Sequence, residues 1–406
     1  MSRVRLTALR VRGVLARALA RTAMRLVPPA PLALVAGLPD TEENSLVTAL
    51  ALARRFRGRI VLVAREPAAA RAALARTARV LGVDHVDRVE VRAKRDPTTP
   101  WLFVRATWVA YTHGLFDSPR PVGRRVHVNL WHGTGPKWNA NANQSVRIGA
   151  DVLAAAGPVW GAEVVRALRQ PRGTVVVPGN PRQDVVVGAR DRTRLAALGL
   201  DPDRPLVLWL PTFRRSATAG RTGLSEGVPL TQDPLARRLA RVAAEHGVQL
   251  VLKAHRHDDD DLGALGVRVL TEKEIAAAGT TLHELMGLAD GVVSDYSSAW
   301  VDFLVTGRSV ALLCPDLDRY EAERGLNRPG LREVAGELLL DEPGAHELFA
   351  TVAGGEVFRA THLAEVRSRL GIGERGGSRA AALLDALARL AGERHGSSLG
   401  LAATSS

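Results

Sequence analysis

The sequence contains very little cysteine and few aromatic side chains. Cys314 is the one cysteine among 406 residues, so an internal disulfide is excluded, and no Cys/His spacing indicates a zinc site. Aromatic residues make up 4% of the chain, which argues against a surface that stacks the bases of single-stranded nucleic acid. No uninterrupted apolar run reaches the length of about 18 residues that a membrane-spanning helix needs. We therefore predict a cytoplasmic protein with no nucleic-acid partner.

The sequence does contain enough apolar material for two domains, together with an excess of positive charge. Hydrophobic residues make up 46% of the 406 residues, a length that suits two α/β domains with short appendages. The formal net charge is +13. Such a surface favours anionic partners, for example nucleotides, polyanionic polymers and anionic lipid.

Residues 1–27 predict a basic amphipathic helix. Apolar residues from Val4 to Leu26 recur near helical spacing, seven arginines fill the gaps, and Pro28-Pro29 ends the pattern. Arginine interrupts the apolar run too often for the core of a signal peptide. Two roles stay open: a helix packed on the first domain, or an interfacial anchor on an anionic membrane.

The rest of the chain shows two series of alternating strand and helix patterns. The expected strands are 32–36, 60–64, 89–91, 101–106 and 126–130 in the first series, and 206–210, 249–253, 267–270, 291–294 and 309–314 in the second. The predicted domains are 28–190 and 191–375, followed by a helix and a frayed tail over 376–406. This alternation predicts two doubly wound parallel sheets, whose ligands bind beyond the carboxyl ends of the strands, in a cleft where the two domains face each other.

One motif combines a histidine with two glycines at a predicted strand end. Residues 129–137 read N-L-W-H-G-T-G-P-K. His132 can act as a general base there, because an imidazole titrates near neutrality. Gly133 and Gly135 allow the backbone to approach a ligand closely. The alternative is an ordinary turn with a structurally bonded histidine.

Two other strands run into cationic segments. Lys253, His255 and Arg256 end one strand and suit a pyrophosphate, and Arg214 lies in the basic loop after another. Asp258–Asp261 follow directly on the first of these segments. Consecutive carboxylates cannot all face one ion, so we expect a solvated loop or a helix start there rather than a metal site.

Two further strand ends carry hydroxyl and carboxylate groups. Ser297 and Ser298 stand where a helix is expected to begin, and its free N–H groups and positive dipole end can bind phosphate. Simple N-capping by serine is the alternative, and one serine can cap while the other binds. Asp316 follows the strand 309–314 and can either accept hydrogen bonds from ribose or polyol hydroxyls or form a turn.

Five strings, in this order, resemble one family. They are W-H-G-T-G-P-K at 131–137, G-N-P-R-Q-D at 179–184, P-T-F-R at 211–214, L-K-A-H at 252–255 and S-D-Y-S-S at 294–298. Together they are similar to the CDP-glycerol glycerophosphotransferases, the teichoic acid primases and polymerases. The pairing of W-H-G with D-Y-S-S is the specific part of the resemblance. It implies a GT-B-like fold of two Rossmann-like domains, a place at the inner face of the cell membrane, and transfer of glycerol phosphate from CDP-glycerol with release of CMP.

The resemblance also implies roles for individual residues. His132 matches the base that activates the acceptor hydroxyl, and His255 matches a histidine near the donor pyrophosphate. Ser297 and Ser298 match phosphate-binding serines, and Asp316 matches the acid near the end of the donor site. Further donor-side candidates are Lys253, Arg214 and Arg182, and the acceptor-side candidates are Gly133, Thr134 and Lys137. The sequence departs from the family at Arg256, where proline is common.

The predicted function is therefore transfer of glycerol phosphate or another polyol phosphate from a CDP-activated donor to a lipid-linked anionic polymer of the cell wall, at an anionic membrane surface. No metal site is predicted, and Mg²⁺ bound through the donor phosphates stays open. One alternative is a GT-B glycosyltransferase with a nucleotide-sugar donor. The other is a non-catalytic polyanion-binding protein, which would need neither His132 nor the serines. The sequence leaves open the choice between glycerol and ribitol, and between primase and polymerase.

Overall fold

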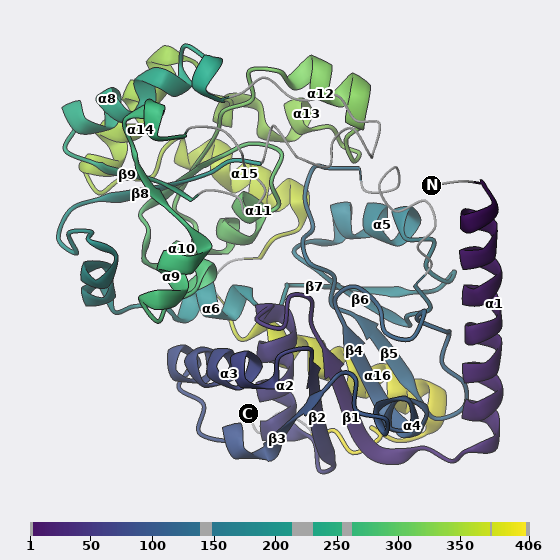
Figure 1. Cartoon of the computed structure of the whole chain (residues 1–406). Helices are drawn as coiled ribbons and strands as arrows, with labels where there is room; N and C mark the ends of the chain where they lie inside the picture. The colour runs from purple at the N-terminus through teal and green to yellow at the C-terminus, as the bar shows by residue number, and fades with distance from the viewer. Residues whose placement is uncertain (1–2, 139–147, 213–229, 254–261, 374–375, 403–406) are drawn as a thin grey trace. The chain divides into compact units, whose positions relative to one another are not determined.

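The structure, a computed structural model, describes residues 3–138, 148–212, 230–253, 262–373 and 376–402 (Figure 1). The chain forms two compact units. Unit 1 comprises Met1–His132, Asn143–Asp184 and Gly377–Ser406, and unit 2 comprises Gly133–Ala142 and Val185–Gly376. The chain therefore passes from unit 1 to unit 2 directly after His132.

Unit 1 is built on a seven-stranded parallel sheet with the order β3-β2-β1-β4-β5-β6-β7. The strands are β1 (Ala30–Ala36), β2 (Arg59–Ala64), β3 (Val89–Ala93), β4 (Ala106–Tyr111), β5 (Val126–Asn129), β6 (Val152–Ala155) and β7 (Val175–Pro178). The central strands β1, β2 and β4 are almost continuously apolar, because helices cover both faces of the sheet. The strand order reverses between β1 and β4, which puts the switch point at the carboxyl ends of these two strands.

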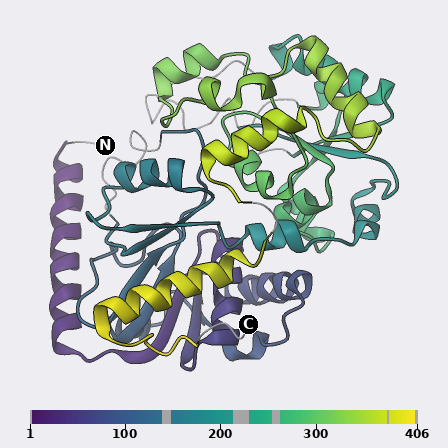
Figure 2. The same ribbon diagram turned by 180° about the vertical axis from the view of Figure 1, so that it is seen from behind.

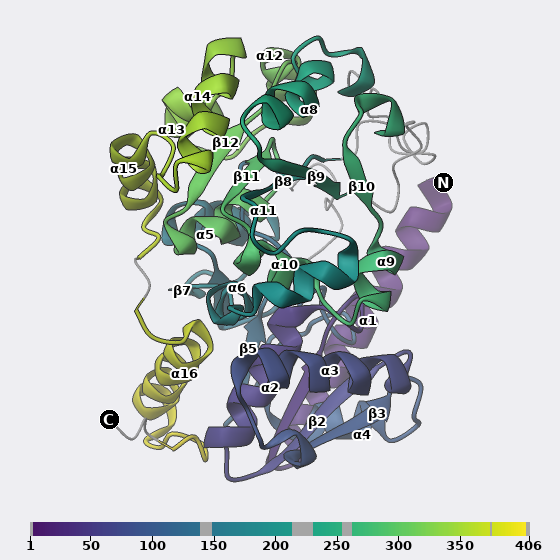
Figure 3. The ribbon, with the colours of Figure 1, turned by 90° about the vertical axis from the view of Figure 1, so that its left-hand side faces the viewer.

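Two apolar cores cover the two faces of this sheet. On one face lie α2 (Glu43–Arg55), α3 (Pro67–Leu81) and α16 (Arg379–His395). On the other lie α1 (Arg3–Leu26), α4 (Thr99–Arg105) and α5 (Pro158–Ala167). Figure 3 shows α2 and α3 in front of the strands, and Figure 2 shows the long α16 running across the sheet from behind.

The helix α1 packs on unit 1 through one side only. Met24 is 2% exposed and Ala20, one turn earlier, packs against the same core cluster. In contrast, Leu15, Leu19 and Leu26 are 57%, 72% and 78% exposed. Residues three, four or seven positions apart share one side of a helix, so the exposed leucines form a stripe of their own. None of the helices that the structure describes is both long and apolar enough to cross a membrane.

The prediction of a strand over 101–106 is wrong. The chain forms α4 there, with proline in the first turn, and the strand β4 begins only at Ala106. The run Trp101–Val104 is continuously apolar, so its pattern fits a buried strand and a short buried helix equally well. Pro100 at the start of a helix decides the outcome, since its missing N–H has no partner to lose at that position. The strands β6 and β7 were not predicted.

Unit 2 is built on a five-stranded parallel sheet with the order β10-β9-β8-β11-β12. Its strands are β8 (Leu206–Leu210), β9 (Gln249–Lys253), β10 (Arg268–Leu270), β11 (Gly291–Ser294) and β12 (Ser309–Leu312), all of which the sequence predicts. Its helices are α8 (Ala236–Glu245), α9 (Glu272–Ala277), α10 (Leu282–Leu288), α11 (Ala299–Phe303), α12 (Leu317–Arg324), α13 (Leu331–Ala335), α14 (Glu342–Ala353) and α15 (Ala360–Leu370), and α6 (Gln183–Gly188) begins at the boundary of unit 1. The switch point of this sheet lies between β8 and β11. The stretch 217–232 is rich in glycine, serine and threonine, a composition that predicts a flexible loop, and most of it lies outside the described residues.

The end of the chain returns to unit 1. The Asp184 carboxylate accepts hydrogen bonds of 2.6, 2.7 and 3.0 Å from the Ser378 hydroxyl and the backbone N–H groups of Arg379 and Ala380, which anchors the start of α16. The sequence predicts a frayed tail after this helix. In the structure Leu401 is 3% exposed and pairs with Phe56, because an apolar side chain within a small polar segment still finds the core of unit 1.

The core of unit 1 contains a buried histidine that makes its stability depend on pH. Burial lowers the pKa of His127 from 6.5 to about 3, although its Nδ1 lies 3.1 Å from the carbonyl oxygen of Pro119. The folded protein thus holds this imidazole neutral, whereas the unfolded chain binds a proton near pH 6.5. Stability is therefore complete above pH 6.5 and is lost as the pH falls from there towards 3.

We predict that His127→Gln reduces this acid sensitivity. One pH unit of unequal protonation is worth about 1.4 kcal/mol, so between pH 7 and pH 5 the variant should lose roughly 2 kcal/mol less than the parent. Urea unfolding at both pH values measures the difference. The exposed His85→Gln is the control and should keep the parent's slope. Equal slopes for the parent and His127→Gln would contradict the assignment.

Candidate functional site

Polar residues gather at the carboxyl edge of each sheet. In unit 1 the central residue is His132, three positions after the end of β5. Trp131 before it adopts a left-handed backbone conformation with φ of 43°, and its N–H donates to Oδ1 of Asn129 at 3.0 Å. This conformation is rare for a bulky residue, so the surrounding structure must stabilise it. It turns the chain sharply out of the sheet and leaves His132 exposed while Trp131 is buried.

A buried polar network supports this turn. The Asn44 amide donates to the carbonyl oxygen of Trp131 at 3.2 Å, and its Oδ1 accepts from the backbone N–H of Arg182 at 3.0 Å. The Arg182 guanidinium donates to the His132 carbonyl oxygen at 2.9 Å and pairs with Glu42 at 3.3 Å. Arg182 and Glu42 have side chains that are only 8% and 7% exposed. These contacts are those of a positioning residue, and the role of Arg182 as a ligand of donor phosphate stays a prediction.

A second histidine, which the sequence analysis missed, contacts the first. His113 follows β4, next to the switch point, and its ring stacks on that of His132 with centroids 4.3 Å apart and planes within 10°. The ring of Trp131 lies against the same pair, with its centroid 4.0 Å from that of His132. A polar residue directly after a predicted strand is the signal that selects His132, and the same signal applies to His113, two residues after the end of β4. The rings of His113 and Trp131 together restrict the orientation of the His132 imidazole.

In unit 2 the carboxyl ends of β8 and β11 meet at the switch point. The backbone N–H and the hydroxyl of Thr212, after β8, both donate to the carboxylate of Asp295, after β11, at 2.9 to 3.0 Å. Asp295 is 1% exposed and also accepts from the N–H of Ser297 at 3.1 Å. One buried carboxylate therefore ties the two central strand ends together and orders the segment that begins α11.

The two serines take different roles at this helix start. The hydroxyl of Ser297 accepts from the N–H of Ala299 at 3.3 Å, which is a capping contact. Ser298 occupies the N-cap position, and its side chain makes no capping hydrogen bond. The hydroxyl of Ser298 is therefore not required by the helix. The structure thus shows capping by one serine, and ligand binding by Ser298 stays a prediction.

Aromatic packing positions Asp316 at the same edge. The hydroxyl of Tyr296 donates to Oδ1 of Asp316 at 2.9 Å. The ring of Tyr296 is buried and stacks on that of Tyr320, with centroids 3.6 Å apart. The Asp316 carboxylate is only partly buried, so it can accept further hydrogen bonds from a ligand hydroxyl.

The residues after His132 pack on unit 2 and bring two predicted motifs together. A Cβ atom at Gly135 would lie 2.9 Å from Cα of Ser298, so only glycine allows this approach. The side chain of Asn327 donates to the Gly135 carbonyl oxygen and the N–H of Asn327 to that of Pro136, both at 2.6 Å. Thr134 is 1% exposed, whereas Lys137 is only partly buried. The H-G-T-G-P-K segment is thus part of the same edge of unit 2 as the serines.

Of the three remaining donor-side candidates, Lys253 is the one that lies in the described part of the chain. Lys253 is the last residue of β9, beside the switch point, and is partly buried. His255 and Arg214, and the aspartates 258–261, lie outside the described residues. In the part of the chain that the structure describes, no group of three or more histidine, cysteine or acidic side chains could hold a metal ion.

Two doubly wound parallel units with polar groups at their strand ends define a GT-B-like fold. The family described as CDP-Glycerol:Poly(glycerophosphate) glycerophosphotransferase matches residues 82–370. The chain belongs to that family, and the family resemblance read from its motifs is confirmed.

Solved structures share this fold. The wall teichoic acid polymerase TagF has a TM-score of 0.62 at 17% identity, covering 97% of this chain and 98% of that chain. A variant of TagF soaked with CDPG has a TM-score of 0.61 at 16% identity, with 96% and 98% covered. At these identities the likeness shows the fold alone.

The curated relatives come from Bacillus spizizenii. A teichoic acid poly(glycerol phosphate) polymerase is 24% identical over 265 residues, which are 58% of this chain and 64% of the polymerase. A teichoic acid ribitol-phosphate primase is 30% identical over 141 residues, which are 34% of this chain and 33% of the primase. The chain therefore spans under two thirds of the length of either relative.

We predict that Gly135→Ala destabilises unit 2. Its new methyl group would lie 2.9 Å from Cα of Ser298, so the loop or the start of α11 must shift. Overpacking of this kind costs about 1–3 kcal/mol, measurable as a lower midpoint of urea unfolding. Gly373→Ala is the matched control, because a Cβ there meets no atom within 4 Å. Equal midpoints for the two variants would show that the contact is not present in solution.

Proposed function

We propose that this chain transfers glycerol phosphate, or another polyol phosphate, from a CDP-activated donor to a hydroxyl of an anionic cell-wall polymer. The observation that carries the proposal is the packing of Gly135 on Ser298, which joins the W-H-G and D-Y-S-S segments at the switch point of unit 2. Family membership supports a CDP-glycerol donor. The two curated relatives, named for glycerol phosphate and ribitol phosphate, support both polyols.

The reaction is a displacement at phosphorus. The acceptor hydroxyl oxygen forms a bond to the phosphorus that carries the polyol, and the bond from that phosphorus to the CMP oxygen breaks. CMP leaves with the electron pair, and His132 takes the proton of the attacking hydroxyl. The exposed imidazole of His132 stacks on His113, and Arg182 holds the His132 carbonyl group. The imidazole is therefore in position before the acceptor binds, which suits a general base.

Positive groups on unit 2 stabilise the charge that develops on CMP. Lys253 ends β9, and the amino end of α11, where the helix dipole is positive, follows Ser298. We assign Ser298 to the donor phosphate and Asp316 to a ribose or polyol hydroxyl. His255 and Arg214 are proposed as further phosphate ligands, on the strength of their places in the family motifs.

The acceptor-side role falls to the segment after His132. Thr134 is buried at 1% exposure, so its contribution is to pack the loop. We assign acceptor contacts to the backbone of Gly133 and to the side chain of Lys137, which is partly buried. A lysine there suits an acceptor whose backbone is a chain of phosphodiesters.

A donor screen separates this proposal from its alternatives. The measurement is nucleotide release from CDP-glycerol, CDP-ribitol and a panel of UDP- and GDP-sugars, each with a lipid-linked polymer acceptor. Release of CMP from a CDP-polyol supports the proposal. Release from the nucleotide sugars alone would establish the glycosyltransferase alternative, and release from none, with the polymer still bound, would establish the non-catalytic one.

We predict that His132→Ala abolishes CMP release and leaves CDP-glycerol affinity within a few-fold of the parent. Loss of a general base typically costs about 10²–10⁴-fold in rate, whereas the donor contacts lie on unit 2. Single-turnover kinetics and calorimetry measure the two effects. The exposed His85→Ala is the control. A variant that keeps more than about a tenth of the parent rate would remove His132 as the base.

We further propose that unit 1 docks on the inner face of an anionic membrane. In the described part of the chain, every exposed large hydrophobic residue belongs to unit 1. They are Val14, Leu15, Leu19 and Leu26 of α1, and Trp101, Phe116 and Val175. An apolar stripe flanked by arginines matches the interfacial region of a bilayer, with apolar side chains in the acyl boundary and cations at the headgroups.

We predict that Leu15→Ser with Leu19→Ser weakens binding to phosphatidylglycerol vesicles by about tenfold or more. Each fully buried leucine contributes about 1.5–3 kcal/mol, and interfacial burial supplies a good part of that. Both side chains are over half exposed, so the melting temperature should not change. Ala72→Ser with Ala75→Ser, at two exposed apolar positions of α3 outside this set, is the control for vesicle flotation. Parent-like flotation of the double variant would exclude the stripe as an anchor.

A further inference from the structure

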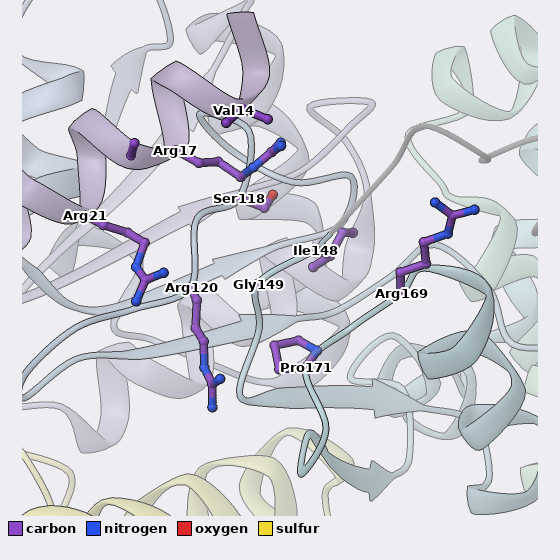
Figure 4. Close-up of a pocket in the computed structure, with 10 residues that line it drawn as sticks. Val14, Arg17, Arg21, Ser118, Arg120, Ile148, Gly149, Arg169 and Pro171 are labelled. Atoms are coloured by element: carbon purple, nitrogen blue, oxygen red, sulfur yellow. The ribbon is translucent and has the colours of Figure 1, made fainter. Parts of the chain in front are cut away.

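Unit 1 contains a second polar site, at the edge of its sheet opposite to His132. It is a pocket of about 420 Å³ between α1 and three loops (Figure 4). The loops contribute Ser118 and Arg120 before β5, Ile148 and Gly149 before β6, and Arg169 and Pro171 before β7. Residues that precede parallel strands lie at the amino edge of a sheet, whereas His132 follows β5 at the carboxyl edge. The pocket is therefore separate from the transfer site.

Four arginines surround this pocket. Arg17 and Arg21 come from successive turns of α1, and Arg120 and Arg169 come from the loops (Figure 4). Among the described residues, none of these four side chains forms an ion pair or a hydrogen bond. The residues that line the pocket include no acid. Four arginine side chains around one pocket repel one another, and an anion bound among them relieves that repulsion.

Apolar side chains and backbone complete the lining of the pocket. Ile148, which is 2% exposed, contributes to it together with Val14, Ala18 and Pro171. A Cβ on Gly149 would lie 2.4 Å from the backbone nitrogen of Arg120, so this close packing of loops needs glycine. The lining therefore combines cationic and apolar groups, which suits an amphiphile rather than a fully hydrated anion.

We propose that this pocket binds the phosphate headgroup of an anionic phospholipid. Arginine binds phosphate oxygens through paired N–H groups, and the apolar lining accepts the glycerol and the first carbons of the acyl chains. The exposed Leu15 and Leu19 project from another side of α1, about 160° around the helix axis from Arg17 and Arg21, and belong to the proposed membrane contact of the same helix. The choice of a lipid over another phosphate ester rests on the proposed membrane docking of unit 1.

The test titrates the full chain with dihexanoyl-phosphatidylglycerol kept below its critical micelle concentration, so that no membrane surface is present. The parent should bind it saturably at one site. The double variant Arg120→Gln, Arg169→Gln should bind at least about tenfold more weakly, because two charge-assisted contacts are lost. Arg172→Gln, at an exposed arginine beside the pocket that does not line it, is the matched control and should bind like the parent.

A charge-conserving variant separates a pocket from general attraction to positive charge. Arg120→Lys with Arg169→Lys keeps the net charge but removes the paired N–H groups. If the pocket binds the lipid, this variant should bind it more weakly than the parent does. If only general attraction to positive charge is at work, the affinity should not change. Binding lost equally in Arg172→Gln, or unchanged in both double variants, would overturn the proposal. Equal affinity for inorganic phosphate or for short glycerol phosphate oligomers would overturn the choice of a lipid.

Turnover distinguishes a failure of this inference from a failure of the proposed function. The pocket lies away from His132, so both double variants should release CMP from CDP-glycerol at the parent rate with a soluble acceptor analogue. A parent that releases no CMP would refute the proposed transfer, and the lipid titration would still decide the pocket. A parent that releases CMP but does not bind the short-chain lipid would refute the pocket alone.

Discussion

Parallel strands place all of their carboxyl ends at one edge of a sheet, and this constraint decides where each unit puts its polar groups. Neighbouring strands lie about 4.8 Å apart, so residues just beyond two adjacent strands become contact partners whatever their separation in sequence. Thr212 and Asp295 are 83 positions apart and share hydrogen bonds because β8 and β11 are neighbours. His113 and His132 stack because β4 and β5 are neighbours. The site residues are thus a consequence of topology more than of local sequence.

Each edge uses a buried charge to order its backbone. The Arg182–Glu42 pair is nearly fully buried, and at such a site the cost of removing both charges from water offsets much of their attraction. The pair therefore contributes mainly by holding the backbone in place and adds little to the free energy of folding. Arg182 and Asn44 donate to the carbonyl oxygens of His132 and Trp131 and so keep Trp131 in its left-handed conformation. Asp295 does the same for the start of α11. The groups that we propose as ligand contacts, His132 and Ser298, lie next to these buried ones.

The sequence predicted the features that are local and missed those that depend on distant partners. The strands of unit 2 were predicted because each is a short apolar run bounded by turn residues. The run 101–106 was misassigned because continuous apolar residues carry no period. The strands β6 and β7, which read V-L-A-A and V-V-V-P, were missed although strands as short, such as β11, were predicted. In the structure Glu42 caps α2 by accepting from the N–H of Ser45 at 3.2 Å, and its ion pair with Arg182 spans 140 positions. No local signal could connect those two residues.

The motifs of the candidate site were found from sequence because their members are contiguous. The motifs could not show that Gly135 packs on Ser298, so that two segments far apart in the sequence contact each other. Backbone contact between them explains why glycine occupies that position. The predictions for His255 and Arg214 stay predictions, since both residues lie outside the described part of the chain.

The sequence left two roles open for the first helix, and the geometry of a helix allows both. Side chains repeat every 3.6 residues, so one helix can present several distinct sides along its length. From Gly13 onward, Ala20 and Met24 face the core, Leu15 and Leu19 face solvent, and the arginines lie on a third side at the pocket. Burial of Met24 sets the rotation of α1 about its axis, and that rotation in turn fixes where the leucines and arginines point. If α1 did not pack on unit 1, its leucines would have no fixed direction relative to the sheet. Packing on unit 1 is therefore a condition for the proposed membrane contact, because it fixes the side of unit 1 on which the leucines are exposed.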